Sequence, residues 1–109
     1  NPRLVERYDA LSGPVLRLLR QLAASCRAHN VPLAVCGEMA GEPLAALALA
    51  GIGLRTLSMS PANIGPVKEA IRSVDLAALG PLLDDLDTLP SRSLRGKLAD
   101  FARDHGVPA

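Results

Sequence analysis

The stretch Pro32-Leu33-Ala34-Val35-Cys36-Gly37-Glu38-Met39-Ala40-Gly41 decides the fold class that this sequence predicts. Its apolar run, Leu33 to Cys36, lies between a proline and a glycine, and its length and flanks predict a short buried strand. Two glycines and one acid follow in residues 37–41, which predicts a loop. Glu42-Pro43 then opens a helix through Ala50 that is apolar on nearly all faces, so we expect it to be buried on most sides.

Helical and extended patterns alternate on either side of this stretch. Ser12-Gly13-Pro14 predicts the start of a helix that ends near His29, with a core-facing stripe of Val15, Leu18, Leu19, Leu22 and Cys26. A second strand is expected at about residues 54–58. Further helices are expected from about Ile64 to Ser73, from about Leu76 to Asp87, and from Ser91 or Ser93 onwards, the last with Leu94, Leu98, Phe101 and Ala102 inward.

The order of elements is therefore α-β-α-β-α-α-α, and strands that alternate with helices indicate an α/β fold with parallel pairing. Two parallel strands do not make a satisfactory sheet alone, because parallel strands are normally covered on both faces and lie among neighbours. We therefore expect either an oligomer or the end of a larger β/α structure. The chain begins with Asn1-Pro2-Arg3 rather than methionine, which favours a piece of a longer protein, and it shows no signal-peptide pattern.

The composition fits one helix-rich globular domain and excludes several classes of protein. Of 109 residues, 49% are hydrophobic, only Tyr8 and Phe101 are aromatic, and the net charge is +1. A near-neutral chain with so few aromatic rings lacks the basic footprint and the stacking surfaces of a nucleic-acid-binding protein. The longest apolar run, Leu44 to Leu54, is too short to span a membrane. Two cysteines are too few for a disulfide scaffold, and free thiols indicate a reducing, cytoplasmic location.

Cys36 is the residue to which the pattern assigns chemistry. It ends the first predicted strand, and ligands bind at the carboxyl ends of parallel strands in β/α folds. A thiol that is protonated at neutral pH can donate a proton to a carbanion or enolate, whereas nearby positive charge would make it a nucleophilic thiolate. A cysteine that fills the core remains the alternative. Gly37 and Gly41 permit a tight turn or the close approach of a ligand, and Glu38 is either a solvated acid or a residue that orients Cys36.

The segment Cys36 to Pro43 resembles the C-G-E-x-A-G-[DE] signature of the phosphoenolpyruvate-utilising enzymes. Within them it is most similar to the phosphoenolpyruvate–protein phosphotransferases, which are enzyme I of the bacterial sugar and nitrogen phosphotransferase systems. Residues 51–64 resemble the next segment of this family, and residues 67–72 resemble the helix after it. Asn1-Pro2-Arg3 and Tyr8-Asp9 are similar to the nitrogen-type members. The resemblance covers about residues 1–75 in order.

The resemblance implies a fold and a place in it. The phosphoenolpyruvate-binding domain of this family is a (β/α)8 TIM barrel. This chain would be its C-terminal portion, with strands seven and eight at about residues 33–36 and 54–58. Residues 1–109 would then form one part of that domain, incomplete on its own, since a whole barrel needs about 250 residues.

The implied reaction moves a phosphoryl group from phosphoenolpyruvate to a histidine of the enzyme and then to an HPr-like carrier protein. Cys36 aligns with the proton donor of the family, which converts enolpyruvate into pyruvate, and Gly37 and Glu38 are the candidates for substrate contacts at the rim. The Mg²⁺ ligands, substrate-binding arginines and phosphorylated histidine of the family lie in segments outside this chain. We therefore expect no metal ligand in residues 1–109, no activity of this chain alone, and solvated helix-end roles for His29 and His105.

Two alternatives stay open. One is the corresponding part of a pyruvate phosphate dikinase or a phosphoenolpyruvate synthase, which are related phosphoenolpyruvate-utilising enzymes. The other is a non-catalytic dimerisation or assembly module, because the family dimerises through its barrel domain. The apolar helices of an incomplete barrel favour self-association, and a homodimer is the expected form.

Overall fold

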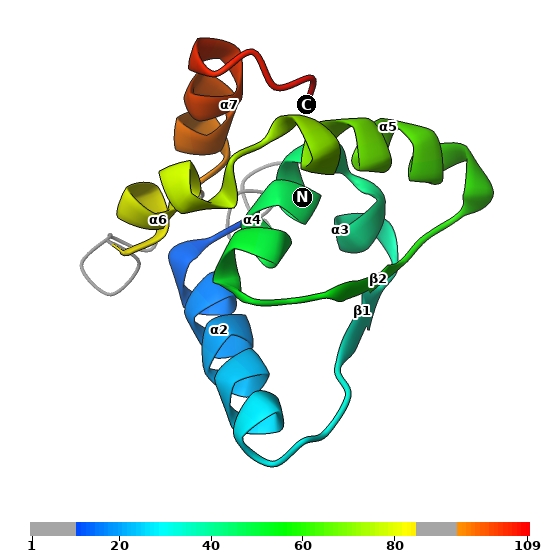
Figure 1. The fold of residues 1–109 in the computed structure, drawn as a ribbon, viewed down its shortest axis with the longest axis vertical. Coiled ribbons are helices and arrows are strands. Elements are labelled where there is room, and N and C mark those ends of the chain that lie inside the picture. Colours follow the sequence, from blue (N-terminus) through cyan, green and yellow to red (C-terminus); the bar gives the residue numbers. More distant parts are fainter. Residues whose placement is uncertain (1–10, 85–93) are drawn as a thin grey trace, which may run out of the picture.

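The computed structural model describes residues 11–84 and 94–109. The described part is mixed α/β and mostly helical. Its elements follow in the order α2 (Gly13–Ala28), β1 (Ala34–Cys36), α3 (Glu38–Gly41), α4 (Pro43–Ile52), β2 (Thr56–Ser58), α5 (Pro61–Ser73), α6 (Leu76–Asp84) and α7 (Arg95–Asp104). Figure 1 shows α4 in the middle, with the strands on one side of it and α6 and α7 on the other. The predicted alternation of helices and strands is confirmed, although both strands are shorter than expected.

The two strands pair in parallel, as the alternation predicts. The register, from the first pair to the last, is Ala34–Thr56, Val35–Leu57 and Cys36–Ser58. The chain crosses from β1 to β2 through α3 and α4, since parallel strands cannot be joined by a tight hairpin. The last residues of both strands therefore lie at the same edge of the sheet.

The two faces of this sheet differ. Val35 and Leu57 pack against the hydrophobic core on the side of the helices. The opposite face carries small and polar residues that are all exposed: Ala34, Cys36, Thr56 and Ser58. The prediction of a buried strand over residues 33–36 is wrong for this face, because no described element covers it.

The core forms around α4, whose side chains from Leu44 to Ala50 are all buried. This helix contacts α2, α5, α6 and α7. Alanines and leucines suit the position, because small apolar side chains allow close packing on several sides and bring no polar group into the core. Gly53 ends the helix in the left-handed conformation with φ 115°, where glycine carries no steric penalty. The predicted burial of this helix on most of its sides is confirmed.

Helix α2 buries a different face from the predicted one. The predicted stripe is largely in solvent, with exposed fractions of 38% for Val15, 64% for Leu18 and 44% for Leu22. Leu19 and Cys26 from the same stripe are half-buried. The buried side chains of this helix are instead Leu16 and Ala23.

Contacts from α4 and α6 explain this choice of face. Small Ala23 lets α2 lie close to α4, which it contacts. Arg20, on the same side of the helix as Leu16 and Ala23, donates a 3.1 Å hydrogen bond from Nη1 to the carbonyl oxygen of Leu83 in α6. The sequence offers two apolar stripes at helical spacing, and only the partners in the fold select one.

Helix α7 keeps its predicted core face, and α6 also packs its leucines against the core. Buried side chains here are Leu79 and Leu83 of α6, Leu98, Phe101 and Ala102 of α7, and Leu94 just before α7. The predicted helix starts at Ser91 and Ser93, and residues 85–87 of the predicted fourth helix, lie outside the described residues. Within the described ranges, no helix is long and apolar enough to cross a membrane.

Candidate functional site

Cys36 is the last residue of β1, and its side chain lies on the exposed face of the sheet. Its partner in register is Ser58, the exposed last residue of β2. Because neighbouring strands lie about 4.8 Å apart, a thiol and a hydroxyl stand side by side at the carboxyl edge of the sheet. The predicted position of Cys36 is therefore the observed one, and this thiol does not fill the core. Its chemical role stays a prediction.

The chain turns sharply directly after Cys36. Gly37 has φ 97° and ψ −163°, a region that residues with a Cβ rarely adopt. The exposed Glu38 then begins the one-turn helix α3, where the sequence predicts a loop. A helix of four residues has too few positions to show a periodic pattern, which is why the prediction of a loop is wrong.

A close contact fixes the end of α3. A Cβ on Gly41 would lie 2.7 Å from Nδ2 of Asn63, a residue in the first turn of α5. The same Nδ2 donates a hydrogen bond of 3.3 Å to Oγ of Ser60. Glycine at position 41 thus allows α5 to approach α3, which lies against both β2 and α5. The segment after Cys36 therefore also lies at the carboxyl end of β2.

An ion pair holds the residue that follows. Glu42 lies between α3 and α4, and its carboxylate bonds to the guanidinium of Arg95, the first residue of α7. A second contact joins Nη2 of Arg95 to Oε2 of Glu42 at 3.4 Å, so the pair is forked. Neither Asn63 nor Arg95 is predicted as a site residue from the sequence. Contacts between residues so far apart in the chain leave no local pattern, although Asn63 lies within the second stretch that carries the resemblance.

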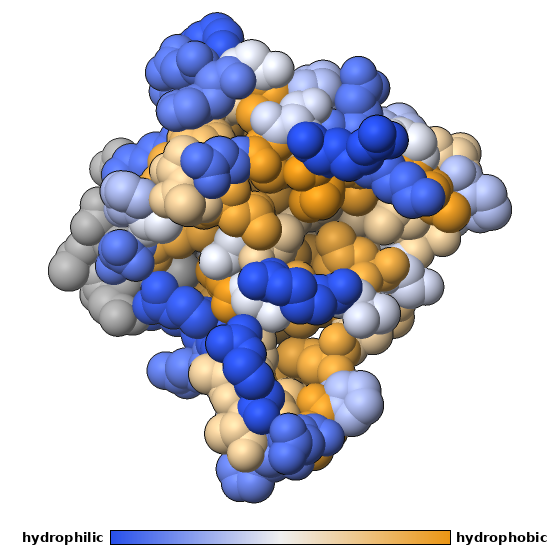
Figure 2. Space-filling model, in the orientation of Figure 1, coloured by the Kyte–Doolittle hydropathy of each residue, from blue (hydrophilic) through white to orange (hydrophobic). Residues whose placement is uncertain are grey.

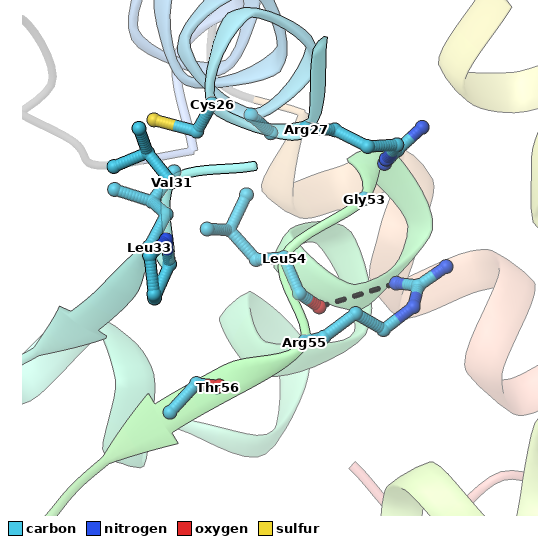
Figure 3. A pocket seen from close by; sticks show the side chains of 10 residues that line it. Cys26, Arg27, Val31, Leu33, Gly53, Leu54, Arg55 and Thr56 are labelled. Carbon is cyan, nitrogen blue, oxygen red and sulfur yellow. Dashed lines mark hydrogen bonds between the residues drawn. The ribbon is translucent and has the colours of Figure 1, made fainter. Parts of the chain in front are cut away.

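The other cysteine lies at the opposite end of the strands. Cys26 is half-buried in α2 and lines a pocket of about 210 Å³, whose other walls include Val31, Leu33 and Leu54 (Figure 3). This pocket faces the amino ends of β1 and β2, because Leu33 precedes β1 and Leu54 precedes β2. The interpretation of Cys26 as a core residue holds only in part.

Two arginines at this amino end lie beside the end of α4. Arg55 donates a hydrogen bond from Nη1 to the carbonyl oxygen of Leu54 at 3.2 Å (Figure 3). The same Nη1 donates to the carbonyl oxygen of Ala50 at 2.7 Å. The guanidinium of Arg27 lies beside Gly53, the residue that ends α4. Cations at a helix C-terminus offset the partial negative charge of its free carbonyl groups. The arginines of this end therefore act on the structure of α4.

Both histidines lie at helix ends, as predicted. Nδ1 of His29 lies 2.9 Å from the carbonyl oxygen of Ser25 at the end of α2. Nδ1 of His105 lies 2.9 Å from the carbonyl oxygen of Phe101 at the end of α7, and the two rings stack with centroids 4.0 Å apart. These contacts explain both residues by the capping of a helix.

The described residues do not fit a magnesium site. Across residues 11–84 and 94–109, no group of three or more His, Cys, Asp or Glu side chains is placed to hold a metal ion. The Mg²⁺ that the resemblance implies therefore has no ligand set in this part of the chain. We call the carboxyl edge of the sheet the rim. It carries the exposed thiol of Cys36, the neighbouring hydroxyl of Ser58 and the turn at residues 37–42, which meets α5 and α7.

Comparison with known proteins finds sequences that are similar to this chain. Residues 1–76 match the family model described as PEP-utilising enzyme, PEP-binding domain. A protein of Salmonella typhimurium named phosphoenolpyruvate-dependent phosphotransferase system is 37% identical over all 109 residues, and its counterpart in Escherichia coli K12 is 36% identical over the same length. A phosphoenolpyruvate-protein phosphotransferase of Cupriavidus necator is 40% identical over 79 residues, or 72% of this chain. The chain spans 14% of the length of each of these three curated relatives.

Proposed function

The chain belongs to the family of phosphoenolpyruvate-utilising enzymes, and we propose that it is the C-terminal part of the phosphoenolpyruvate-binding domain of a phosphoenolpyruvate–protein phosphotransferase. The observation that carries this proposal is the position of Cys36, exposed at the carboxyl end of β1 beside the parallel strand β2. The relatives described above carry phosphotransferase-system names, so we favour this parent over a pyruvate phosphate dikinase or a phosphoenolpyruvate synthase.

In the proposed reaction, the bond between phosphorus and the enol oxygen of phosphoenolpyruvate breaks, and the phosphoryl group passes to a histidine of the enzyme and then to an HPr-like carrier. The enolate of pyruvate that remains needs a proton on its methylene carbon. The thiol of Cys36 donates this proton as a general acid and is later reprotonated from solvent. An exposed thiol at the carboxyl edge is in reach of a ligand bound there, which supports the assignment.

The proposed fold is the last two strands and the closing helices of a (β/α)8 barrel. In such a barrel the helices cover the outer face of the strands, and the inner face meets the other strands. Val35 and Leu57 pack on the side of the helices, whereas the opposite face is open and carries small and polar residues. Both observations fit a sheet segment that other strands would close.

A groove beside β2 also fits an open edge. It has a volume of about 520 Å³, and its apolar lining consists of Leu57, Met59, Ile64 and Val67 from β2, the turn after it and α5. Figure 2 shows apolar side chains exposed on this side of the molecule, between α5 and the strands. A neighbouring strand would bury them.

The remaining parts of the reaction belong, in this proposal, to other segments of the enzyme. Mg²⁺ and the phosphorylated histidine would be held there, because the described residues include no cluster of metal ligands and both histidines cap helices. The purified 109-residue chain should therefore release no pyruvate from phosphoenolpyruvate. Pyruvate release by this chain alone would contradict the proposal.

The test is a chimera in which residues 1–109 replace the matched segment of the Escherichia coli relative. Pyruvate formation is followed with Cys36→Ala, and with Cys26→Ala as a matched control because Cys26 lies at the other end of the strands. Loss of a general acid lowers turnover by about 100-fold or more, so Cys36→Ala should do so, and Cys26→Ala should leave turnover within about twofold. If Cys36→Ala turned over as fast as the native chimera, the assignment would be wrong.

A second candidate function is that of an assembly module. The observation that favours it is the exposed apolar stripe of Val15, Leu18 and Leu22 on α2. Exposed apolar stripes mark contacts between proteins or between parts of one protein. Light scattering of the purified chain tests self-association through this stripe, which Leu18→Gln should weaken, and a monomer at high concentration would exclude it.

A further inference from the structure

The forked pair of Glu42 and Arg95 lies at the boundary between the rim and the core. The main-chain N–H of Glu42 donates to the carbonyl oxygen of Met39 at 3.5 Å and closes α3. Its carbonyl oxygen accepts from the N–H of Ala46 at 2.8 Å and begins α4. The position of Glu42 therefore sets both the end of α3 and the start of α4.

The carboxylate of Glu42 is directed to α7 and not to its own helix. It makes no capping hydrogen bond to α4, although it occupies the N-cap position of that helix. Arg95 receives it in a forked arrangement, and such an arrangement fixes orientation as well as distance. Glutamate is not among the residues favoured at N-caps, so this carboxylate is available to join the start of α4 to α7.

Helix α7 does not need this pair to remain in place. Leu94, Leu98, Phe101 and Ala102 bury it against the core around α4, and the N–H of Leu94 donates to the carbonyl oxygen of Leu11 at 2.7 Å. The pair itself is 41% and 40% exposed, and ion pairs so exposed contribute little to stability. The pair therefore has more effect on the orientation of the turn than on the attachment of the helix.

The turn after Cys36 is held from two sides. Asn63 of α5 occupies the space that a Cβ on residue 41 would need, and Arg95 of α7 binds the side chain of Glu42. Gly41 and Glu42 are the last residues of the turn, and Cys36 and Gly37 are its first. Contacts at the end of a short turn restrict the backbone conformations that are open to its first residues.

We propose that Arg95 is a positioning residue for Cys36: by binding Glu42 it fixes the rim turn that follows the thiol. This inference rests on the proposed function for its effect on catalysis, but not for its effect on the turn. It gives the C-terminal helix α7, which lies outside the matched residues 1–76, a part in the site.

The first test measures amide hydrogen exchange in the 109-residue chain by mass spectrometry. Arg95→Gln and Glu42→Gln should each raise the exchange rate of residues 38–46 by about threefold or more, since local contacts set local opening. The double variant should show no larger increase than either single one. Because Arg95 also has other contacts, Glu42→Gln is the variant specific to this pair. Lys97→Gln, which removes an exposed cation from the same helix, is the matched control.

The second test uses the chimera described above. Arg95→Gln and Glu42→Gln should lower kcat for pyruvate formation by about tenfold and leave KM for phosphoenolpyruvate within about twofold, because misplacing a reacting group acts on the chemical step. The exchanged pair Glu42→Arg/Arg95→Glu should recover most of the lost kcat. Lys97→Gln should change neither constant.

The results of the two tests decide whether Arg95 positions Cys36. Unchanged exchange in residues 38–46, or an increase spread equally over α7 and the other helices, overturns the positioning role. Faster exchange of the turn with unchanged kcat overturns it as well. If Cys36→Ala left turnover intact while exchange at the turn responded as expected, the proposed function would fail and the structural link between α7 and the turn would stand.

Discussion

The carboxyl end of the two strands and their amino end are built in different ways. At the carboxyl end, a four-residue helix is fixed by an unusual backbone conformation at Gly37, a close approach at Gly41 and an ion pair at Glu42. At the amino end, apolar side chains such as Leu54 bury surface, and Arg55 binds free carbonyl groups. The first set of contacts shapes a turn, and the second stabilises the fold. In β/α barrels function lies at the carboxyl ends of the strands and stability at the amino ends, so we expect the same division here.

The largest effect on stability is expected at the amino end. Leu54 is 2% exposed, and Leu54→Ala should lower the free energy of unfolding by about 2–5 kcal/mol, because it removes buried surface and leaves a cavity. Chemical denaturation of the 109-residue chain measures this loss. Leu18→Ala is the control with the same chemical change on a side chain that is 64% exposed, and it should cost far less. Equal losses would remove the contrast between buried and open surfaces.

A substitution at the carboxyl end should lower stability less than Leu54→Ala does, but it should lower activity more. Gly37→Ala places a Cβ on a residue with φ 97° and ψ −163°, which should cost about 1–3 kcal/mol of unfolding free energy. Gly96→Ala is the control, since Gly96 lies in α7 without a positive φ and with no atom near its Cβ position. In the chimera, only Gly37→Ala should lower turnover. If turnover were retained, the turn after Cys36 would have no role in the reaction.

The smallest effect tests the contact between α3 and α5. Gly41→Ala brings a Cβ to 2.7 Å from Nδ2 of Asn63, which must move, and overpacking of this kind costs about 1 kcal/mol. Asn63→Ala removes the clash, so the double variant should regain most of the unfolding free energy that Gly41→Ala loses. A full double-mutant cycle by chemical denaturation gives the coupling between the two positions. Additive losses would show that the close approach does not limit residue 41.

Much of the fold could be predicted because it depends on local patterns. The parallel pairing followed from the alternation of helices and strands, and the burial of α4 followed from its alanines and leucines. The inward side chains of α7 were also predicted, because one face of that helix is apolar and the other charged. In each of these elements a single solution satisfies the pattern.

The rest depends on partners that no local pattern specifies. The buried face of α2 was predicted only in part, because two stripes of the helix are apolar and the choice between them is made by α4 and α6. The strand pattern at residues 33–36 also predicted burial on both faces, whereas one face is exposed, although the presence of only two strands indicated an incomplete sheet. A short apolar run between proline and glycine predicts a strand, but it does not say how many neighbours that strand has.

The candidate site divides in the same way. The position of Cys36 at a strand end and the special conformation of Gly37 could be anticipated, since both follow from residues adjacent in the chain. Asn63 and Arg95 could not, because each meets the turn across a long stretch of sequence. The proton-donor role of Cys36 comes from the resemblance and remains a proposal.

The central place of α4 has a consequence for how this polypeptide loses its structure. The five other described helices, α2, α3, α5, α6 and α7, all contact α4, so each depends on it for part of the surface that it buries. Because α4 is the common partner, the described helices share one hydrophobic core and do not form separate cores that could unfold at different temperatures. We expect one cooperative unfolding transition in which the turn after Cys36 and the helices packed on α4 lose their structure together.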